Sequence, residues 1–120
     1  MATAKQVYLA KKLEEKYGAI GKVAGRYLEA GLSIEINHPT RYGPIHIVAR
    51  GGKNIYAIEV VDKPGKLSLD VVRNLVEKAK IVKAKPILVL CSNAISVGDE
   101  VYKFCIENGV KIKLFRSGEK

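Results

Sequence analysis

The sequence predicts a mixed α/β fold in which a central β-sheet is flanked by helices. Three observations lead to this prediction: the hairpin-like stretch PIHIVARGGKNIYAIEVV at residues 44–61, a continuous apolar run at residues 86–91, and helical periodicity before, between and after them. An antiparallel meander followed by strand–helix–strand crossovers gives a mixed sheet with helices on both sides. With 120 residues, the chain is expected to form one domain over residues 1–120, to which residues 1–18 add an N-terminal helix.

Two helices are expected first. Apolar residues at helical spacing predict them over residues 4–17 and 19–30, ended by Gly18 and Gly31. Two successive short helices are also compatible with a helix-turn-helix motif. The second helix, however, offers only Lys22 and Arg26 to a DNA groove, and its apolar stripe indicates core packing.

Strands follow these helices. Alternation predicts one over residues 32–37, and two more on either side of a Gly-Gly turn at residues 51–54. The connecting loop at residues 38–43 mixes an imidazole, a guanidinium and an aromatic ring. A loop of this composition beside a sheet can contact phosphate and stack on a base, and an ordinary polar connector is an equally weighted alternative.

The second half alternates helices and strands. A turn at residues 62–66 leads to a helix that begins near Ser68 and ends near Ile81, then a buried strand at 86–91 and a loop at 92–97. A helix over 98–108 and a strand over 110–115 with outward lysines complete the pattern, and the tail at 116–120 is expected to be frayed. The exposed side of the middle helix is expected to carry, in varying degree, Arg73, Lys78, Lys80, Lys83 and Lys85.

Charge and cysteine usage restrict the partner and the compartment. The 21 basic against 12 acidic residues give a net charge of +9, which in a small domain favours a polyanion, nucleic acid before membrane. A lysine-rich thermophile surface is the alternative, although such surfaces tend to balance lysine with glutamate. Cys91 and Cys105 stand in apolar contexts and are interpreted as small core residues of a protein in the reducing cytoplasm. Neither a signal peptide nor a membrane-spanning run is recognisable.

His46 and Glu59 lie near the centres of the two apolar runs, where polar residues are unexpected. The surrounding text, GPIHIVARGGKNIYAIEVV, resembles the restriction-endonuclease-like (PD-(D/E)xK) nucleases, and among them the archaeal-type Holliday junction resolvases. That family carries an aspartate after a Gly-Pro or similar turn, an apolar strand, a Gly-Lys hairpin and an apolar E-x-K. The step of 13 residues from His46 to Glu59 is the family's step from aspartate to glutamate, and the resemblance covers roughly residues 20–92.

The family's catalytic residues carry over only in part. Glu59 matches the glutamate, whereas His46 replaces the aspartate, Val61 replaces the lysine, and Lys22 falls near the position of the early-helix glutamate. Such nucleases use carboxylates to hold Mg²⁺ and a lysine to position the attacking water or stabilise charge. The resemblance therefore implies a degenerate nuclease that needs no cofactor and binds nucleic acid, or a partner, without cutting it.

Three alternatives stay open. The site is active if His46 and Glu59 are metal ligands, with Mg²⁺ or Mn²⁺ as cofactor or Zn²⁺ in the same place, and Lys63 or Arg73 replaces the missing lysine. In the second alternative there is no metal, and Glu59 is a buried carboxylate that pairs with His46 across the hairpin, so that each satisfies the polar group of the other. In the third alternative, the chain is a non-catalytic interaction subunit of a nuclease complex. This alternative requires an exposed apolar patch.

The expected nucleic-acid contacts are electrostatic, with little base readout. DNA is expected in preference to RNA, and the resemblance implies a role in DNA recombination or repair and a homodimer, because symmetric cutting calls for two-fold symmetry. The residues expected to bind the nucleic acid are Arg41, Tyr42, Lys53, Lys63, Lys66 and Arg73.

Overall fold

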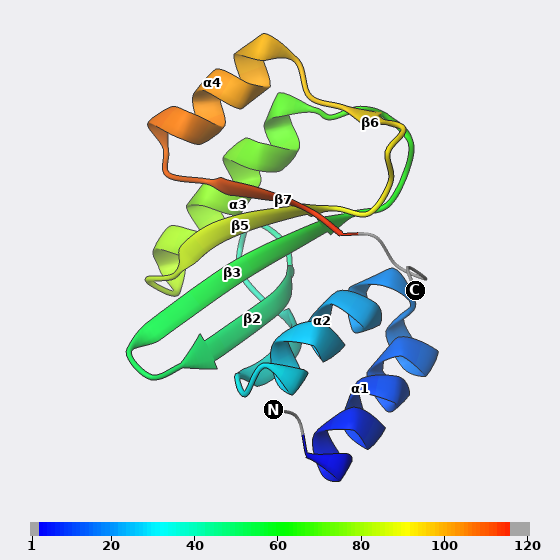
Figure 1. Ribbon diagram of the computed structural model, residues 1–120. Coiled ribbons are helices and arrows are strands. Elements are labelled where there is room, and N and C mark those ends of the chain that lie inside the picture. The colour runs from blue at the N-terminus through cyan, green and yellow to red at the C-terminus, as the bar shows by residue number, and fades with distance from the viewer. Residues whose placement is uncertain (1–2, 116–120) are drawn as a thin grey trace.

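The computed structural model describes residues 3–115, and the expected frayed tail at 116–120 lies outside this range. Within residues 3–115, four helices and seven strands follow one another (Figure 1). In order they are α1 (Ala4–Tyr17), α2 (Ala19–Glu29), β1 (Ser33–His38), β2 (Ile45–Gly51), β3 (Asn54–Val61), β4 (Gly65–Lys66), α3 (Leu69–Ile81), β5 (Lys85–Leu90), β6 (Ile95–Ser96), α4 (Asp99–Glu107) and β7 (Lys111–Leu114). The predicted long elements are confirmed, with ends displaced by one or two residues.

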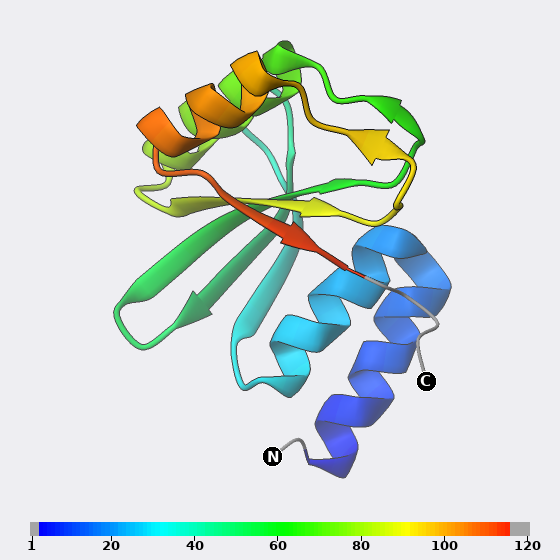
Figure 2. The same ribbon diagram turned by 45° about the horizontal axis from the view of Figure 1, so that its top comes forward.

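The main sheet is mixed, as predicted. Its five strands lie in the order β1-β2-β3-β5-β7, with antiparallel pairing from β1 to β3 and parallel pairing from β3 through β5 to β7. Helices α3 and α4 cover one face and α1 and α2 lie on the other (Figure 2). No helix within residues 3–115 combines the length and the apolar content needed to cross a bilayer.

Alternation along the strands divides the core between these two faces. On the α3 face, Val48, Ala57 and Leu88 pack under α3 and α4, while on the α2 face Ile47 and Ile58 pack under α2. His46 shares the parity of Val48 on β2, and Glu59 shares the parity of Ala57 on β3. Both polar residues therefore belong to the α3 face.

The cysteines are free thiols and take the core positions expected from their apolar contexts to different extents. Cys105 on α4 is buried, whereas Cys91, which follows β5, is only half-buried. Burial raises the pKa of both thiols, and Asp62 raises that of Cys91 further. Both side chains consequently stay protonated at neutral pH.

A short second sheet corrects the expectation of a plain turn at 62–66 and a plain loop at 92–97. Strands β4 and β6 pair in parallel, Gly65 with Ile95 and Lys66 with Ser96. The Leu67 N–H donates to the Ser96 carbonyl at 2.9 Å, and the Leu67 side chain is buried. Two-residue strands are too short to show alternation in the sequence, which is why the pairing escaped prediction.

Helices α1 and α2 approach one another at two glycines. A Cβ added at Gly21 would lie 1.9 Å from the Leu13 carbonyl oxygen, and one added at Gly25 would lie 3.0 Å from the Ala10 Cβ. At the junction of the two helices, Gly18 ends α1 with a φ of 63°, a backbone conformation that suits glycine. The close contact of α1 with α2 therefore depends on the missing side chain at position 21.

Substitution of Gly21 by alanine tests this contact. Replacement of an exposed helical glycine by alanine raises the free energy of unfolding of a protein by about 1 kcal/mol, through helix propensity alone. Here we expect the opposite sign, a net loss of about 1–2 kcal/mol, because overpacking against a backbone oxygen forces the helices apart. Thermal and urea unfolding of Gly21→Ala beside Asn74→Ala, an exposed position on α3, measures it; a rise in stability for Gly21→Ala would contradict the packing.

The edge strand β1 carries a small polar cluster. Glu35 accepts a hydrogen bond from His38 Nδ1 at 2.7 Å, and the Arg50 Nη1 lies 3.4 Å from the other Glu35 oxygen. The hydrogen bond with His38 is the largest cause that lowers the pKa of Glu35 below 4.5, partly opposed by desolvation and assisted by Arg50. His38 thus belongs to β1, paired with Ile45, and not to the loop in which the sequence placed it.

The cluster predicts a pH dependence of stability. Because the pKa of Glu35 is lower in the folded than in the unfolded chain, its contribution is complete above the ordinary glutamate pKa and is lost as the pH falls through the folded value. We expect Glu35→Gln to lower the Tm at pH 7, where the contribution is complete, and to leave the Tm at low pH almost unchanged, so that the acid limb of a plot of Tm against pH becomes flatter. Glu107→Gln, an exposed glutamate on α4, is the control and should leave the slope unchanged.

Candidate functional site

The antiparallel register of β2 and β3 brings His46 and Glu59 together. The pairs Ile47 with Ile58 and Val48 with Ala57 place position 46 opposite position 59. The His46 Nε2 lies 3.7 Å from the Glu59 Oε2, with side chains 26% and 13% exposed. The two polar residues of the hairpin therefore face one another at the end of the ladder, where β2 begins and β3 ends.

One ring nitrogen of His46 is occupied by the backbone. The Val60 N–H donates to His46 Nδ1 at 3.0 Å, so Nδ1 is an acceptor without a proton. A neutral imidazole has a single N–H, and this contact assigns it to Nε2, which faces Glu59. His46 thereby satisfies a strand N–H that the ladder leaves free, and directs a positive dipole at the carboxylate.

Lys78 of α3 supplies the second neighbour of Glu59. Its Nζ lies 3.7 Å from the Glu59 Oε1 and donates a hydrogen bond to the Pro44 carbonyl at 3.0 Å. The residue is 8% exposed, so its charge lies inside the protein. A cluster of His46, Glu59 and Lys78, here called the fork cluster, thus joins α3 to the start of β2 and the end of β3.

The fork cluster balances charge more completely than it satisfies hydrogen bonds. Glu59 Oε1 is buried and has no hydrogen-bond partner among the described residues, because Lys78 lies at ion-pair distance but beyond hydrogen-bond distance. A buried carboxylate is costly unless it is paired, and here the ammonium supplies the compensating charge. The negative charge of Glu59 is therefore already neutralised by the protein itself.

The residues of the fork cluster do not fit the Mg²⁺ ion that the nuclease resemblance implies. Mg²⁺ prefers about six oxygen ligands, and this site offers one carboxylate. His46 has no free lone pair in this arrangement, and the Lys78 ammonium repels a cation from the same carboxylate. Within residues 3–115, no group of three or more His, Cys, Asp or Glu side chains gathers at metal-binding distance.

Lys78 was assigned to an exposed helix side by the sequence, and the structure corrects this. The two cations that the sequence offered as substitutes for the missing lysine, Lys63 and Arg73, are both exposed, and Lys78 forms the ion pair instead. A signal was present, since position 78 falls on the same stripe as Val72 and Leu75. A lysine on an apolar stripe is expected to face solvent unless a buried carboxylate lies opposite, and the sequence does not show that Glu59 lies opposite Lys78.

The structure separates the residues predicted to bind nucleic acid into two groups, all of them exposed. Lys53 lies in the β2–β3 turn, six residues along the strand from Glu59, or about 20 Å at the rise of a strand. The other five belong to segments that adjoin the opposite end of the hairpin or the following helix, and Arg41 stacks over Tyr42 with 5.4 Å between guanidinium and ring. They are Arg41, Tyr42, Lys63, Lys66 and Arg73.

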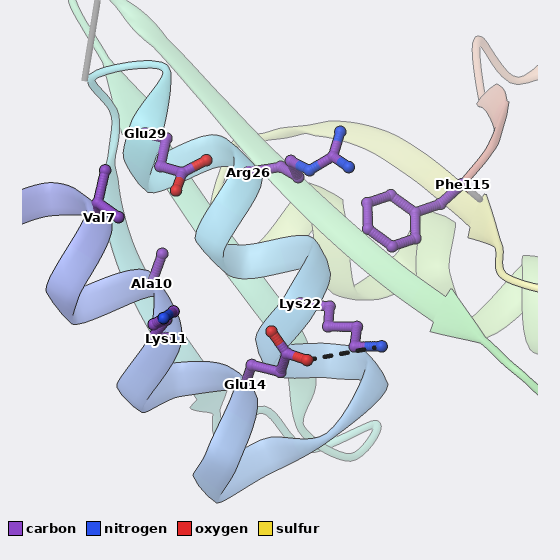
Figure 3. A pocket seen from close by; sticks show the side chains of 8 residues that line it. All are labelled: Val7, Ala10, Lys11, Glu14, Lys22, Arg26, Glu29 and Phe115. Atoms are coloured by element: carbon purple, nitrogen blue, oxygen red, sulfur yellow. Dashed lines mark ion pairs between the residues drawn. The ribbon is translucent and has the colours of Figure 1, made fainter. Parts of the chain in front are cut away.

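Lys22, near the position of the family's early-helix glutamate, forms its ion pair elsewhere. It lies on α2, and its Nζ forms an ion pair with the Glu14 Oε2 of α1 at 3.5 Å (Figure 3). Helix α2 covers the face of the sheet opposite to the fork cluster. Lys22 therefore contributes nothing to the surroundings of Glu59.

The chain matches no protein-family model and no curated protein sequence. Several solved structures, by contrast, resemble this chain. An EndoMS–dsDNA complex has a TM-score of 0.60 and 16% identity over 100% of this chain and 48% of its own. A repair endonuclease from Pyrococcus abyssi has a TM-score of 0.58 and 16% identity over 97% of this chain and 48% of its own. SfsA from Pyrococcus furiosus, in complex with Ca²⁺, has a TM-score of 0.56 and 18% identity over 89% of this chain and 56% of its own.

The fold is that of the restriction-endonuclease-like nucleases. The fold expected from the hairpin text is thereby confirmed, and the chain spans about half the length of these neighbours. The identities of 16–18% carry the architecture alone. Which residues are functional must come from the fork cluster and the surface of this chain.

A double-mutant cycle tests the pairing of Lys78 with Glu59. Lys78→Met leaves a buried carboxylate uncompensated, and we expect a loss of about 3 kcal/mol in the free energy of unfolding. The Lys78→Met/Glu59→Gln double variant should recover most of this loss, because neither buried charge remains. Urea unfolding at neutral pH gives all four corners of the cycle; additive losses in the double variant would show that the two side chains do not interact.

Proposed function

We propose that this chain is a nucleic-acid-binding protein that keeps the nuclease fold and does not cut. The observation that carries this proposal is the ion pair between Lys78 and Glu59, which puts a protein cation beside the one carboxylate shared with the family pattern. The chain lacks the second carboxylate and the strand lysine at positions 46 and 61, and His46 supports the backbone of β3 instead. Binding then rests on the net charge of +9.

DNA is the proposed partner, in recombination or repair within the cytoplasm. Two neighbours support this choice by what they are, an EndoMS bound to double-stranded DNA and a repair endonuclease. A preference for branched DNA and a homodimeric state follow from the resemblance to Holliday junction resolvases and stay proposals. At the end of the hairpin that holds the fork cluster, here called the fork end, the proposed DNA contacts come from Arg41, Tyr42, Lys63, Lys66 and Arg73. Lys53 contributes at the other end of the hairpin.

An active nuclease is the second candidate, and one observation favours it. Lys78 stands beside Glu59 and supplies from α3 the kind of charge that Val61 no longer supplies from β3. A metal ligand at His46, however, would require the ring to release the Val60 N–H and move its proton to Nδ1. The balance of these two observations favours binding without cleavage.

The deciding experiment combines cleavage and binding on the same substrates. Duplex, single-stranded and four-way-junction DNA are incubated with the protein and Mg²⁺ or Mn²⁺, and binding is measured by fluorescence anisotropy at two salt concentrations. We expect every strand to stay intact, while affinity falls steeply with salt, with a log–log slope of about −0.9 per phosphate contact on duplex. Matched RNA substrates test the preference for DNA.

Two variants separate the outcomes. Cleavage that is lost in both Glu59→Gln and Lys78→Met would overturn the inactive proposal and establish the second candidate. Cleavage that persists in both variants would indicate a contaminating nuclease. If neither binding nor cutting occurs at low salt, nucleic-acid binding itself is wrong, and the remaining expectation is an interaction subunit of a nuclease complex.

A further inference from the structure

The α2 face of the sheet is not covered evenly. Helix α2 packs over the middle strands, whereas β7 at the edge presents Lys111 and Lys113 on this side and Ile112 toward α3 and α4. Two adjoining hollows of about 240 and 260 Å³ follow the line between α2 and the outer strands. They share Tyr27, Ala30 and Lys113, and together form one surface, the α2–β7 groove.

The charge of this groove has one sign. Its cations are Arg26 from α2 and Lys111 and Lys113 from β7. Among the described residues that line it, none is an aspartate or a glutamate. Beyond Arg26 the surface becomes mixed, where Glu29 and the ion-paired Glu14 line the neighbouring hollow (Figure 3). The positive potential is therefore strongest between Arg26 and the β7 lysines, away from these glutamates.

Aromatic rings alternate with these cations. Tyr27, Tyr56 and Phe115 line the groove and are each partly exposed. The Arg26 guanidinium lies 5.1 Å from the centre of the Phe115 ring, and the Lys113 ammonium lies 5.8 Å from the centre of the Tyr27 ring. Tyr27 and Tyr56 line the same hollow, and burial together with the neighbouring Tyr56 raises the pKa of Tyr27. Each cation and ring thus form a unit with a flat apolar face and a positive charge.

We propose that the α2–β7 groove binds a single strand of nucleic acid, with phosphates held by Arg26, Lys111 and Lys113 and unpaired bases stacked on the rings. A cationic groove with interspersed aromatic side chains is the arrangement by which proteins hold single strands without reading sequence. Duplex bases are already stacked on one another and cannot use the rings, so the aromatic content favours a single strand. DNA and RNA share the chemistry that this groove recognises.

This proposal rests on the nucleic-acid binding proposed above and adds a location that differs from the fork end. The groove lies on the α2 face, whereas His46, Glu59 and α3 lie on the other. Arg73, on α3, therefore belongs to the surface proposed earlier and not to the groove. Charge reversals on the two faces can be compared directly.

The first experiment compares charge reversals on the two faces. Binding of labelled oligo-dT and oligo-U of about 16 nucleotides, and of a duplex of equal length, is measured by anisotropy for Arg26→Glu/Lys113→Glu. We expect single-strand affinity to fall at least about tenfold and the salt slope to shrink by about 1.4, at about 0.7 per lost phosphate contact. Lys80→Glu/Lys103→Glu, at exposed positions of α3 and α4, is the control with an equal change of net charge. Circular dichroism of each variant establishes that it is folded.

The second experiment reports stacking directly. The chain contains no tryptophan, so Phe115→Trp places a unique fluorophore in the groove. We expect oligo-dT or oligo-U to quench its emission as a base stacks on the indole, and the duplex to quench it much less. Phe115→Leu, which keeps the apolar contact but removes the ring, should reduce the preference for single strands over duplex.

The outcomes separate this proposal from the one on which it rests. If single strands and duplex bind but Arg26→Glu/Lys113→Glu has no more effect than Lys80→Glu/Lys103→Glu, the groove is wrong and binding elsewhere stands. The same holds if Arg73→Glu weakens single-strand binding more than the groove variant does. If duplex quenches the indole as strongly as a single strand, the groove binds duplex and the stacking proposal is overturned. Absence of binding to every oligonucleotide at low salt overturns both proposals.

Discussion

The buried ion pair between Lys78 and Glu59 is the constraint on which the arrangement of the site depends. Lys78 reaches from α3 across the helix–sheet boundary, and its hydrogen bond to Pro44 fixes the start of β2 while its charge compensates the end of β3. His46 completes the arrangement by accepting the Val60 N–H. The start of β2, the end of β3 and helix α3 are thus joined at one point, and Glu59, the carboxylate that matches the nuclease pattern, is paired within the protein.

Much of the fold could be predicted because its signals are local. The Gly-Gly turn sets the hairpin register, and the register alone places His46 opposite Glu59. The parallel strand β5 is announced by an uninterrupted apolar run. The pairing of β4 with β6 escaped because two residues carry no period, and its partners are separated by a whole helix and strand.

The fork cluster was harder to predict because it depends on how far a long side chain extends from its helix. A lysine side chain is long enough to lie on an apolar stripe and still place its ammonium several ångströms away, so sequence spacing does not reveal which carboxylate it meets. Lys63 and Arg73 were reasonable candidates by proximity in the chain, yet Lys78 faces Glu59 because α3 crosses the sheet above β3. The α2–β7 groove had no sequence signal either, since its cations and rings come from α2, β3 and β7.

The buried ammonium of Lys78 has a consequence for how the charge at this point of the fold is compensated. Nucleases that gather several carboxylates at one point tolerate their mutual repulsion more easily when a divalent ion is present. Here the compensating charge for Glu59 is the ammonium group of Lys78, a residue encoded in the same chain. In the electrostatics of this point of the fold, Lys78 takes the place that a divalent ion takes beside clustered carboxylates.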